Sequence, residues 1–255
     1  MIKESLFFLF NNEKSSDYNV ISVNQGSDLY EESFAANRTI RETKVKNNDI
    51  PYFEGLDTEP LSFPLTLYVN KKFNEFDLSN IKKWLYLDNY APLSFEADID
   101  KVFYVLFHDV STLKHNARGE GYITVQVRCD SPFSYSHIIS SPIYNTADPL
   151  IKVPIEIDNN GELPIMPVIH IEKTGNGSIE IENLSSYDSP FKIEDLQDGE
   201  KVTIDCANEL IETSLLGISR YDSSNEEYIK LPVGINRLNI KGSCIISFEY
   251  EFKYF

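Results

Sequence analysis

Apolar and polar residues alternate in two-residue steps along three segments of the chain. Residues 122–129, 179–182 and 246–254 each place apolar side chains at every second position and polar side chains between them. Successive side chains of a β-strand point to opposite faces, so this alternation predicts strands with one buried and one wet face. The last segment is predicted as a single long strand. Turn signals rich in asparagine and glycine separate such runs, at 159–161, 175–177 and 198–199.

A helical period is clear in one segment, residues 76–90. Its apolar residues recur at helical spacing, and Trp84 widens the apolar stripe. Asp77 or Ser79 is expected to cap the start of this helix. Residues 206–214 form a second, shorter helix candidate.

The first apolar run, Leu6–Phe10, is far shorter than the ~20 residues that a membrane-spanning helix needs. Glu4 stands where a signal peptide would be basic, so a first β-strand is the better interpretation. The aromatic content of 13% also favours β-structure. We expect a chain that folds in a cytoplasm.

The charge balance excludes some partners. The 255 residues include 40 acidic and 23 basic side chains, which gives a net charge of −17. A protein that grips nucleic acid needs clustered cations, and so does one that adsorbs to an anionic membrane. We therefore expect neither a sequence-specific nucleic-acid partner nor a membrane.

A change in composition predicts two domains. Six of the twelve prolines fall between residues 132 and 167, which is typical of a connector. We place the boundary so that residues 1–140 form the first domain and residues 141–255 the second, with net charges of −6 and −11. Residues 24–50 are polar and predict a long loop or an extended arm.

No pattern in the sequence assigns a catalytic, cofactor-binding or metal-binding residue. None of the four histidines, His108, His115, His137 and His170, has a partner at a metal-ligand spacing such as HxxxH. His108 and Asp109 follow an apolar run, which favours a loop, and His170 is expected on a strand facing a neighbour or water. We predict a protein that is not an enzyme and that needs no cofactor.

Two groups of carboxylates have structural interpretations. Glu96, Asp98 and Asp100 alternate in a segment that lacks the glycine and oxygen spacing of an EF-hand loop, so a solvated turn is expected. Glu180 and Glu182 share one strand face, whereas a glycosidase needs carboxylates that converge from opposite sides of a bond. We interpret that pair as part of an outer sheet face.

The cysteines and one glycine turn also have structural interpretations. Cys129, Cys206 and Cys244 are odd in number, form no CxxC pair and fall on the apolar side of strand-like segments. Buried free thiols are therefore expected. Residues 175–177 suggest a phosphate nest, but a strand and not a helix follows them, so we interpret them as a hairpin turn.

Several segments, taken in order, resemble the distal tail proteins of phages with long non-contractile tails, the phage tail component family. The resemblance includes an opening strand, turn and second strand, a helix ending in Trp-Leu before an acidic turn, and a glycine turn between two later strands. The stretches that carry it are 8–23, 51–69, 76–107, 121–136, 161–183, 198–211 and 231–255. One departure is that the family's glycine-rich loop corresponds to Pro51–Gly55, which contains one glycine.

This resemblance implies a fold and a function. The fold is mainly β: an N-terminal β-rich ring-forming domain with one α-helix, followed by a C-terminal galectin-like or jelly-roll β-sandwich. The family forms a homohexamer ring that joins the tail-tube protein to a tail-associated lysin or fibre protein, and sometimes to a receptor-binding protein. The expected location is the tail tip of the virion. DNA would pass through the ring, and Glu96, Asp98 and Asp100 are expected to face its lumen.

A carbohydrate-binding β-sandwich module is the alternative function. It would use the second half of the chain, where Tyr187, Tyr221 and Tyr228 lie in polar, loop-like surroundings. Exposed tyrosine rings can serve as platforms for sugars. This alternative leaves the first half of the chain without a role.

Overall fold

The computed structural model describes residues 5–23, 35–116 and 118–255, and these residues form a mainly β-structure with one α-helix. The chain divides into two compact units, residues 1–135 with Phe255 and residues 136–254. Each unit has a hydrophobic core of its own. The predicted fold class is confirmed at this level.

The main sheet of unit 1 is antiparallel, in the order β2-β1-β7-β8-β9-β6-β3. A short strand, β10 (Ser134–Tyr135), joins β8 through the pair Tyr135 and Val102. The strands predicted at Leu6–Phe10 and 122–129 correspond to β1 and β9. The bounds are β1 (Phe8–Phe10), β2 (Glu13–Lys14), β3 (Val20–Ser22), β6 (Ser62–Val69), β7 (Ala91–Phe95), β8 (Asp98–His115) and β9 (Gly121–Cys129).

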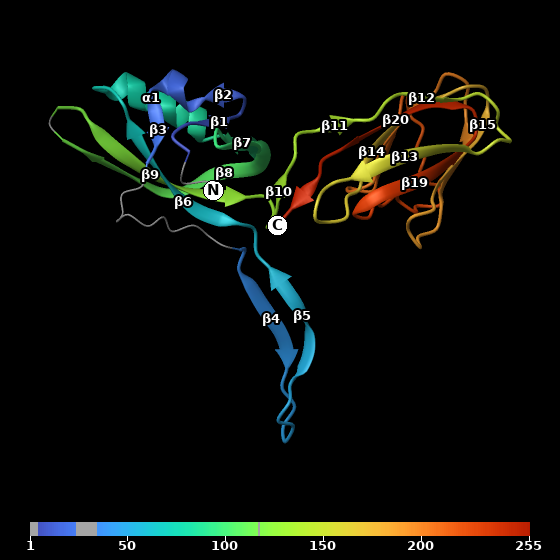
Figure 1. Ribbon diagram of the computed structural model, residues 1–255, viewed down its shortest axis with the longest axis horizontal. Coiled ribbons are helices and arrows are strands. Elements are labelled where there is room, and N and C mark those ends of the chain that lie inside the picture. Colours follow the sequence, from blue (N-terminus) through green and yellow to red (C-terminus); the bar gives the residue numbers. More distant parts are fainter. Residues whose placement is uncertain (1–4, 24–34, 117) are drawn as a thin grey trace. The chain divides into compact units, whose positions relative to one another are not determined.

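The helix α1 (Glu75–Leu85) packs against the core of this sheet (Figure 1). Its buried residues Ile81, Trp84 and Leu85 are those that the helical period predicts. The indole N–H of Trp84 donates a hydrogen bond of 3.1 Å to the carbonyl of Phe10. This bond ties the helix to β1.

The start of α1 differs from the prediction. The cap is Asn74, not Asp77 or Ser79, and its side chain accepts a hydrogen bond of 3.0 Å from the Asp77 N–H. In return the Asp77 carboxylate accepts a hydrogen bond of 3.1 Å from the Asn74 N–H. This reciprocal capping box satisfies two backbone donors at the helix start, which neither predicted cap could do from inside the helix.

The strands β4 (Arg38–Thr43) and β5 (Tyr52–Thr58) form a two-stranded sheet of their own. Of the two forms predicted for residues 24–50, a long loop or an extended arm, the loop is wrong over β4, where the chain is extended and paired. Residues 24–34 lie outside the described residues. The loop expected at Pro51–Gly55 is wrong from Tyr52 onward, because those residues pair with β4.

Unit 2 contains two antiparallel sheets. The first runs in the order β11-β20-β14-β17-β18, with β12 also paired to β20, and the second runs β13-β19-β15-β16. The short strand β21 (Lys253–Tyr254) follows β20 in the chain. The bounds are β11 (Ile139–Ser140), β12 (Tyr144–Thr146), β13 (Val153–Asn159), β14 (Val168–Lys173), β15 (Gly177–Asn183), β16 (Phe191–Leu196), β17 (Lys201–Asp205), β18 (Leu210–Thr213), β19 (Gly234–Lys241) and β20 (Cys244–Tyr250).

One apolar core lies between these two sheets. Ile169 and Phe248 come from the first sheet and Ile181 and Leu238 from the second, and all four are fully buried. Two sheets that share one core in this way form a β-sandwich. The sandwich predicted for the second half of the chain is confirmed.

Residues 175–177 are a turn, but the hairpin interpretation is wrong. The strand before the turn, β14, pairs with β17 and β20, whereas the strand after it, β15, pairs with β16 and β19. The chain thus crosses from one sheet to the other. The Asp198 carboxylate accepts a hydrogen bond of 2.6 Å from the Gly175 N–H and holds this crossing.

The helix candidate at 206–214 is also wrong, because Leu210–Thr213 is the edge strand β18. The Asp205 carboxylate accepts hydrogen bonds of 3.0 Å from the N–H groups of Ala207 and Asn208, which forms a turn instead of a helix. Glu209 then adopts a left-handed conformation with φ 55°. The chain therefore reverses and pairs with β17.

The long terminal strand is interrupted. β20 ends at Tyr250, because Phe252 exchanges hydrogen bonds with the backbone and hydroxyl of Ser136. The proline-rich connector is also more regular than predicted. Pro154 lies in β13, an edge strand that pairs with β19 alone, and an edge tolerates the missing N–H donor.

Candidate functional site

One face of the hairpin of β4 and β5 carries three large apolar side chains beside Arg38, Glu42 and Thr58, and the other face is polar apart from Tyr52. The pairs Ile40–Leu56 and Glu42–Phe53 lie on one face, because directly opposed residues of an antiparallel pair point the same way. Ile40, Phe53 and Leu56 are 60%, 68% and 47% exposed. We call these three residues the hairpin stripe.

The other face of the hairpin holds an ion pair. Arg41 and Asp57 approach to 3.1 Å between Nε and Oδ1, and the Arg41 side chain lies 3.4 Å from where a Cβ at Gly55 would stand. Tyr52 pairs with Thr43 on this same polar face. The two faces therefore differ in chemistry although both are open to solvent.

This arrangement is unfavourable for an isolated chain. A two-stranded hairpin is marginally stable in water, and large apolar side chains gain free energy when they are covered. The hairpin stripe makes an exposed apolar strip on a ribbon that has no second layer in the described part of unit 1. Such a strip is a typical protein–protein contact surface.

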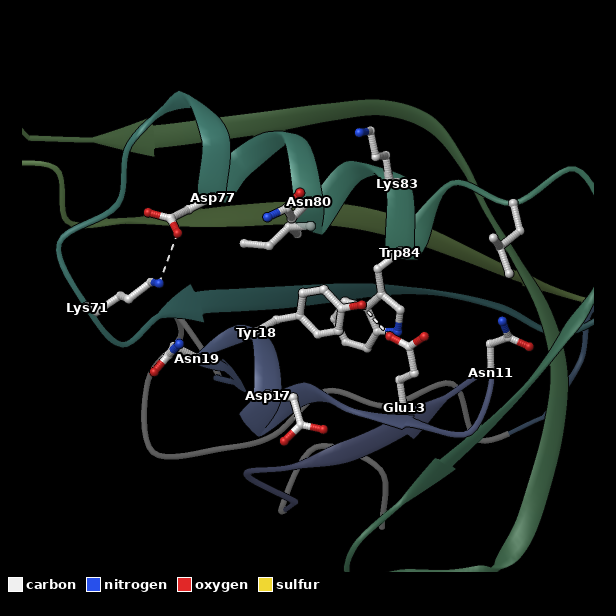
Figure 2. Close-up of a pocket in the computed structure, with 12 residues that line it drawn as sticks. Asn11, Glu13, Asp17, Tyr18, Asn19, Lys71, Asp77, Asn80, Lys83 and Trp84 are labelled. Carbon is white, nitrogen blue, oxygen red and sulfur yellow. Dashed lines mark hydrogen bonds and ion pairs between the residues drawn. The ribbon is translucent and has the colours of Figure 1, made fainter.

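A second feature of unit 1 is a pocket of about 500 Å³ between α1 and the N-terminal segment that contains η2 (Ser15–Tyr18). Figure 2 shows Tyr18 lying against Trp84 in this pocket. The two rings are nearly parallel, with centroids 4.3 Å apart and an interplanar angle of 4°. Trp84 in turn stacks on Phe8 at 5.5 Å.

Charged groups surround this ring stack. The Tyr18 hydroxyl donates a hydrogen bond to the Glu13 carboxylate, and that bond, together with burial, raises the pKa of Tyr18 to about 12. On the opposite side the Lys71 ammonium lies 2.9 Å from the Asp77 carboxylate. The bond from Lys71 and the Asn74 N–H lower the pKa of Asp77. Tyr18 is therefore neutral and Asp77 ionised at neutral pH.

The predicted histidine candidates do not converge. His108 and Asp109 lie inside β8 and not in a loop, at a register shift between His108 and Thr112, while the side chain of Asp109 lies outside the described ones. His170 stands on β14, with Nε2 3.4 Å from Glu249, as its alternation predicts. His115 and His137 lie elsewhere, on β8 and before β11.

The solvated turn predicted for Glu96, Asp98 and Asp100 is right for Glu96 and wrong for the other two, because Asp98 pairs with Phe95 and begins a strand. Glu96 lies in the turn between β7 and β8, and Asp98 and Asp100 begin β8, all three exposed. Glu180 and Glu182 pair with lysines on the surface of the four-stranded sheet. Across residues 5–23, 35–116 and 118–255 no three His, Cys, Asp or Glu side chains form a group that could hold a metal ion.

The three tyrosines considered as sugar platforms in the sandwich differ in their surroundings. Tyr221 and Tyr228 pack against the core, and their hydroxyls bond to the backbone of Ile211 and Glu209. Only Tyr187 of the three is fully exposed. The hydroxyls of Tyr221 and Tyr228 are thus already bonded within the sandwich, which leaves Tyr187 as the fully open ring of the three.

The thiol prediction is confirmed. Cys129, Cys206 and Cys244 are free and buried, and burial raises the pKa of Cys129 and of Cys206 to about 12. Within the described ranges, no helix has both the length and the apolar character that a membrane crossing requires.

The sequence did not predict the hairpin stripe or the Tyr18 pocket. The signal for the first is the cluster Ile40, Phe53 and Leu56 within polar surroundings. Tyr18 and Trp84 are distant in sequence, and no local pattern links them.

The chain is similar to phage tail proteins along its whole length. Residues 3–131 match the family model described as a phage tail protein N-terminal domain, and residues 146–250 match a phage tail C-terminal domain. The SPbeta prophage-derived uncharacterized protein YomH of Bacillus subtilis (strain 168) is 34% identical over 254 residues, and the match covers 100% of both chains.

Two solved structures share the fold. A crystal structure of the SPP1 Dit protein has a TM-score of 0.68 at 16% identity, and the match covers 96% of this chain and 98% of that one. A chain of the phage P2 baseplate in its activated conformation with Ca has a TM-score of 0.56 at 6% identity, with 96% and 97% covered. At these identities the likeness concerns the fold alone.

Proposed function

Because this chain belongs to the phage tail protein family, whose N-terminal and C-terminal domain models it matches in turn, we propose that it is a structural hub at the distal end of a phage tail. The hub is a homohexamer ring in the virion tail tip, and unit 1 forms the ring. It joins the tail-tube protein to a lysin, fibre or receptor-binding protein of the tip. It acts through assembly, and we assign it no catalytic residue.

The fold supports this proposal. The SPP1 Dit protein, whose fold the chain shares over nearly all its length, is described as a paradigm of the hub adsorption apparatus in phages that infect Gram-positive bacteria. A second structural relative comes from a phage baseplate. Unit 2, with its closed sandwich core, would then be the peripheral domain.

The observation that carries the proposal is the hairpin stripe. A ring is built from a heterologous interface, in which one surface of each subunit contacts a different surface of the next. The amphipathic hairpin of β4 and β5 supplies one such surface, because Ile40, Phe53 and Leu56 lie open on a ribbon that needs a second layer. In the ring, the stripe would be covered by the neighbouring copy.

The test is to replace residues 38–58 with a short glycine-serine linker. We expect the wild-type chain to form rings, visible by negative-stain microscopy and by mass in solution, and the variant to stay a folded monomer. A matched control changes Tyr187 and Leu216, two fully exposed residues of unit 2, to serine and should leave the rings intact. Rings that persist without the hairpin, or a wild-type chain that stays monomeric, would contradict the proposal.

The ring would enclose a channel through which DNA passes. An acidic wall repels a polyanion, so the genome could slide without adhering, whereas a cationic wall would hold phosphates. Glu96, Asp98 and Asp100 are exposed and are our candidates for that wall. The alternative role of the net charge of −17 is solubility before assembly. A ring structure in which lysine and arginine equal or outnumber acidic residues on the channel wall would leave only solubility.

A further inference from the structure

The pocket between α1 and η2 has a flat aromatic floor. Tyr18, Trp84 and Phe8 form a continuous stack. Tyr18 is the outermost ring and lines the cavity, where it lies against Trp84 (Figure 2). Trp84 is buried and anchored by its bond to Phe10, so the stack is held in one position before any ligand arrives. A pre-ordered aromatic face binds a ligand at low entropic cost.

The walls of the pocket carry both hydrogen-bond donors and acceptors. Asn80 and Lys83 come from α1, and Asn11, Glu13 and Asp17 come from the opposite side. No hydrogen bond joins the side-chain amides of Asn11 or Asn80 to any residue that the structure describes. These amides offer two donors and one acceptor each to a ligand.

We propose that this pocket binds a neutral saccharide ring, stacked on Tyr18 and held at its rim by Asn80, Asn11 and Asp17. The C–H face of a sugar is apolar and packs on an aromatic ring, while its hydroxyls both donate and accept hydrogen bonds. A volume of about 500 Å³ is within the usual range for small-ligand pockets. This site lies in unit 1, away from the tyrosines predicted for sugar binding in the sandwich.

The charges of the pocket disfavour an anionic ligand. Lys71 and Asp77 neutralise each other, which leaves the carboxylates of Glu13 and Asp17 opposite the ammonium of Lys83. An anionic ligand would meet those two carboxylates. A basic side chain would meet Lys83 and would have no acceptor to offer the amide donors.

Trp84 makes the site directly observable, because it is the one tryptophan in the sequence. The experiment titrates the full chain with glucose, galactose and N-acetylglucosamine and follows the emission of Trp84. We expect a saturable change with at least one of these sugars, at a Kd on the order of 1 mM. Glycerol, which has hydroxyls but no ring face, should give no saturable change.

Variants link the signal to the pocket. Tyr18→Ala should remove the saturable response, and Tyr18→Phe, which keeps the ring and loses only the bond to Glu13, should retain it. If Tyr18→Ala fails to fold, Asn80→Ala provides the test and should weaken binding about tenfold. Tyr187→Ala, at a fully exposed tyrosine of unit 2, is the matched control and should bind as the wild type does.

The outcomes distinguish a saccharide ligand from a basic side chain of a partner protein. A folded chain that responds to none of the three sugars overturns the proposal. A saturable response to N-acetyl-argininamide without one to sugars also overturns it and identifies a docking pocket for a partner's arginine. Because the pocket lies within one unit of one chain, this result is independent of whether the chain forms rings.

Discussion

The antiparallel strand pairs β13–β19 and β4–β5 differ in what covers their apolar side chains. β13 and β19 belong to the four-stranded sheet of the sandwich, whereas β4 and β5 form a sheet of two strands. In the first, Ile155 and Ile157 point inward and are buried in the sandwich core. In the second, Ile40 and Phe53 point to solvent from an antiparallel ribbon with one register shift, between Arg41 and Glu42. The difference is the second layer, which the sandwich supplies from its own chain and the hairpin lacks. The sandwich thus covers the inner face of β13 and β19 with its own chain, whereas the hairpin of unit 1 presents a surface that gains from a partner.

Polar contacts strengthen the same contrast. In the sandwich, Glu200 is fully buried and its two carboxylate oxygens accept hydrogen bonds from Arg220, Thr213 and the Gln197 N–H. In the hairpin, Arg41 and Asp57 form an ion pair with both side chains more than half exposed. An exposed pair contributes little to stability, and a buried charge that loses its partner costs several kcal/mol.

The largest expected effect concerns the independence of unit 2. We predict that a fragment of residues 136–254 folds alone, whereas residues 150–255 fold poorly because β11 and β12 are missing. The Thr146 hydroxyl in β12 accepts a hydrogen bond of 2.9 Å from the Cys244 N–H, so its loss uncovers β20. Dispersed amide signals from the shorter fragment, equal to those of the longer one, would show that β12 is dispensable.

A sequence pattern predicts an element of the fold when the side chains that form the pattern pack within the same unit of the chain. The alternation in segments 122–129 and 179–182 predicts strands correctly, because the apolar sides of these strands pack into the core of their own unit. No sequence pattern predicts the hairpin of β4 and β5, because its apolar residues stay exposed and do not alternate regularly with polar ones. Spacing alone also could not show that the turn at 175–177 links two sheets.

No sequence pattern predicts the Tyr18 pocket either, for a related reason. Tyr18 and Trp84 each look like ordinary core aromatics, and only the packing of α1 against β1 brings them together. In the sandwich, polar neighbours in the sequence wrongly suggest exposed tyrosines. Tyr221 and Tyr228 lie in polar sequence surroundings, yet the fold turns both rings against the core.

The next effect is the loss of a core side chain. Phe248 is fully buried between the two sheets, so Phe248→Ala should lower the free energy of unfolding by about 3–5 kcal/mol. Urea denaturation followed by circular dichroism measures this. The matched control is Phe76→Ala on the exposed side of α1, which should change stability by less than about 0.5 kcal/mol. Equal losses in the two variants would contradict the assigned core.

A smaller, pH-dependent effect is expected at Glu200. Burial alone would raise the pKa of this carboxyl, but hydrogen bonds from Arg220, Gln197 and Thr213 outweigh it and hold the pKa below the ordinary value of 4.5. A depressed carboxyl pKa stabilises the folded state above the unfolded pKa, and this contribution is lost as pH falls through the folded pKa. Glu200→Gln should therefore cost about 1–3 kcal/mol at neutral pH.

The difference between wild type and Glu200→Gln should shrink as the pH falls below about 4.5, measured as the melting temperature at a series of pH values. The control is Glu156→Gln. Its pair with Arg237 has side chains 68% and 63% exposed, so less than about 1 kcal/mol is expected at any pH. A gap between wild type and Glu200→Gln that widens in acid would contradict the sign.

The smallest effect on stability, and the most specific for assembly, is expected at the hairpin stripe. Phe53→Ser should change the unfolding free energy of the monomer by no more than about 0.5 kcal/mol, because its ring is already in water. The substitution should nevertheless weaken assembly of the hexamer, because the neighbouring copy would cover the Phe53 side chain. Tyr52→Ser is the matched control, an adjacent aromatic of similar exposure on the polar face. Light scattering over a concentration series should separate the two variants, whereas identical assembly would mean that the hairpin stripe is not the contact surface.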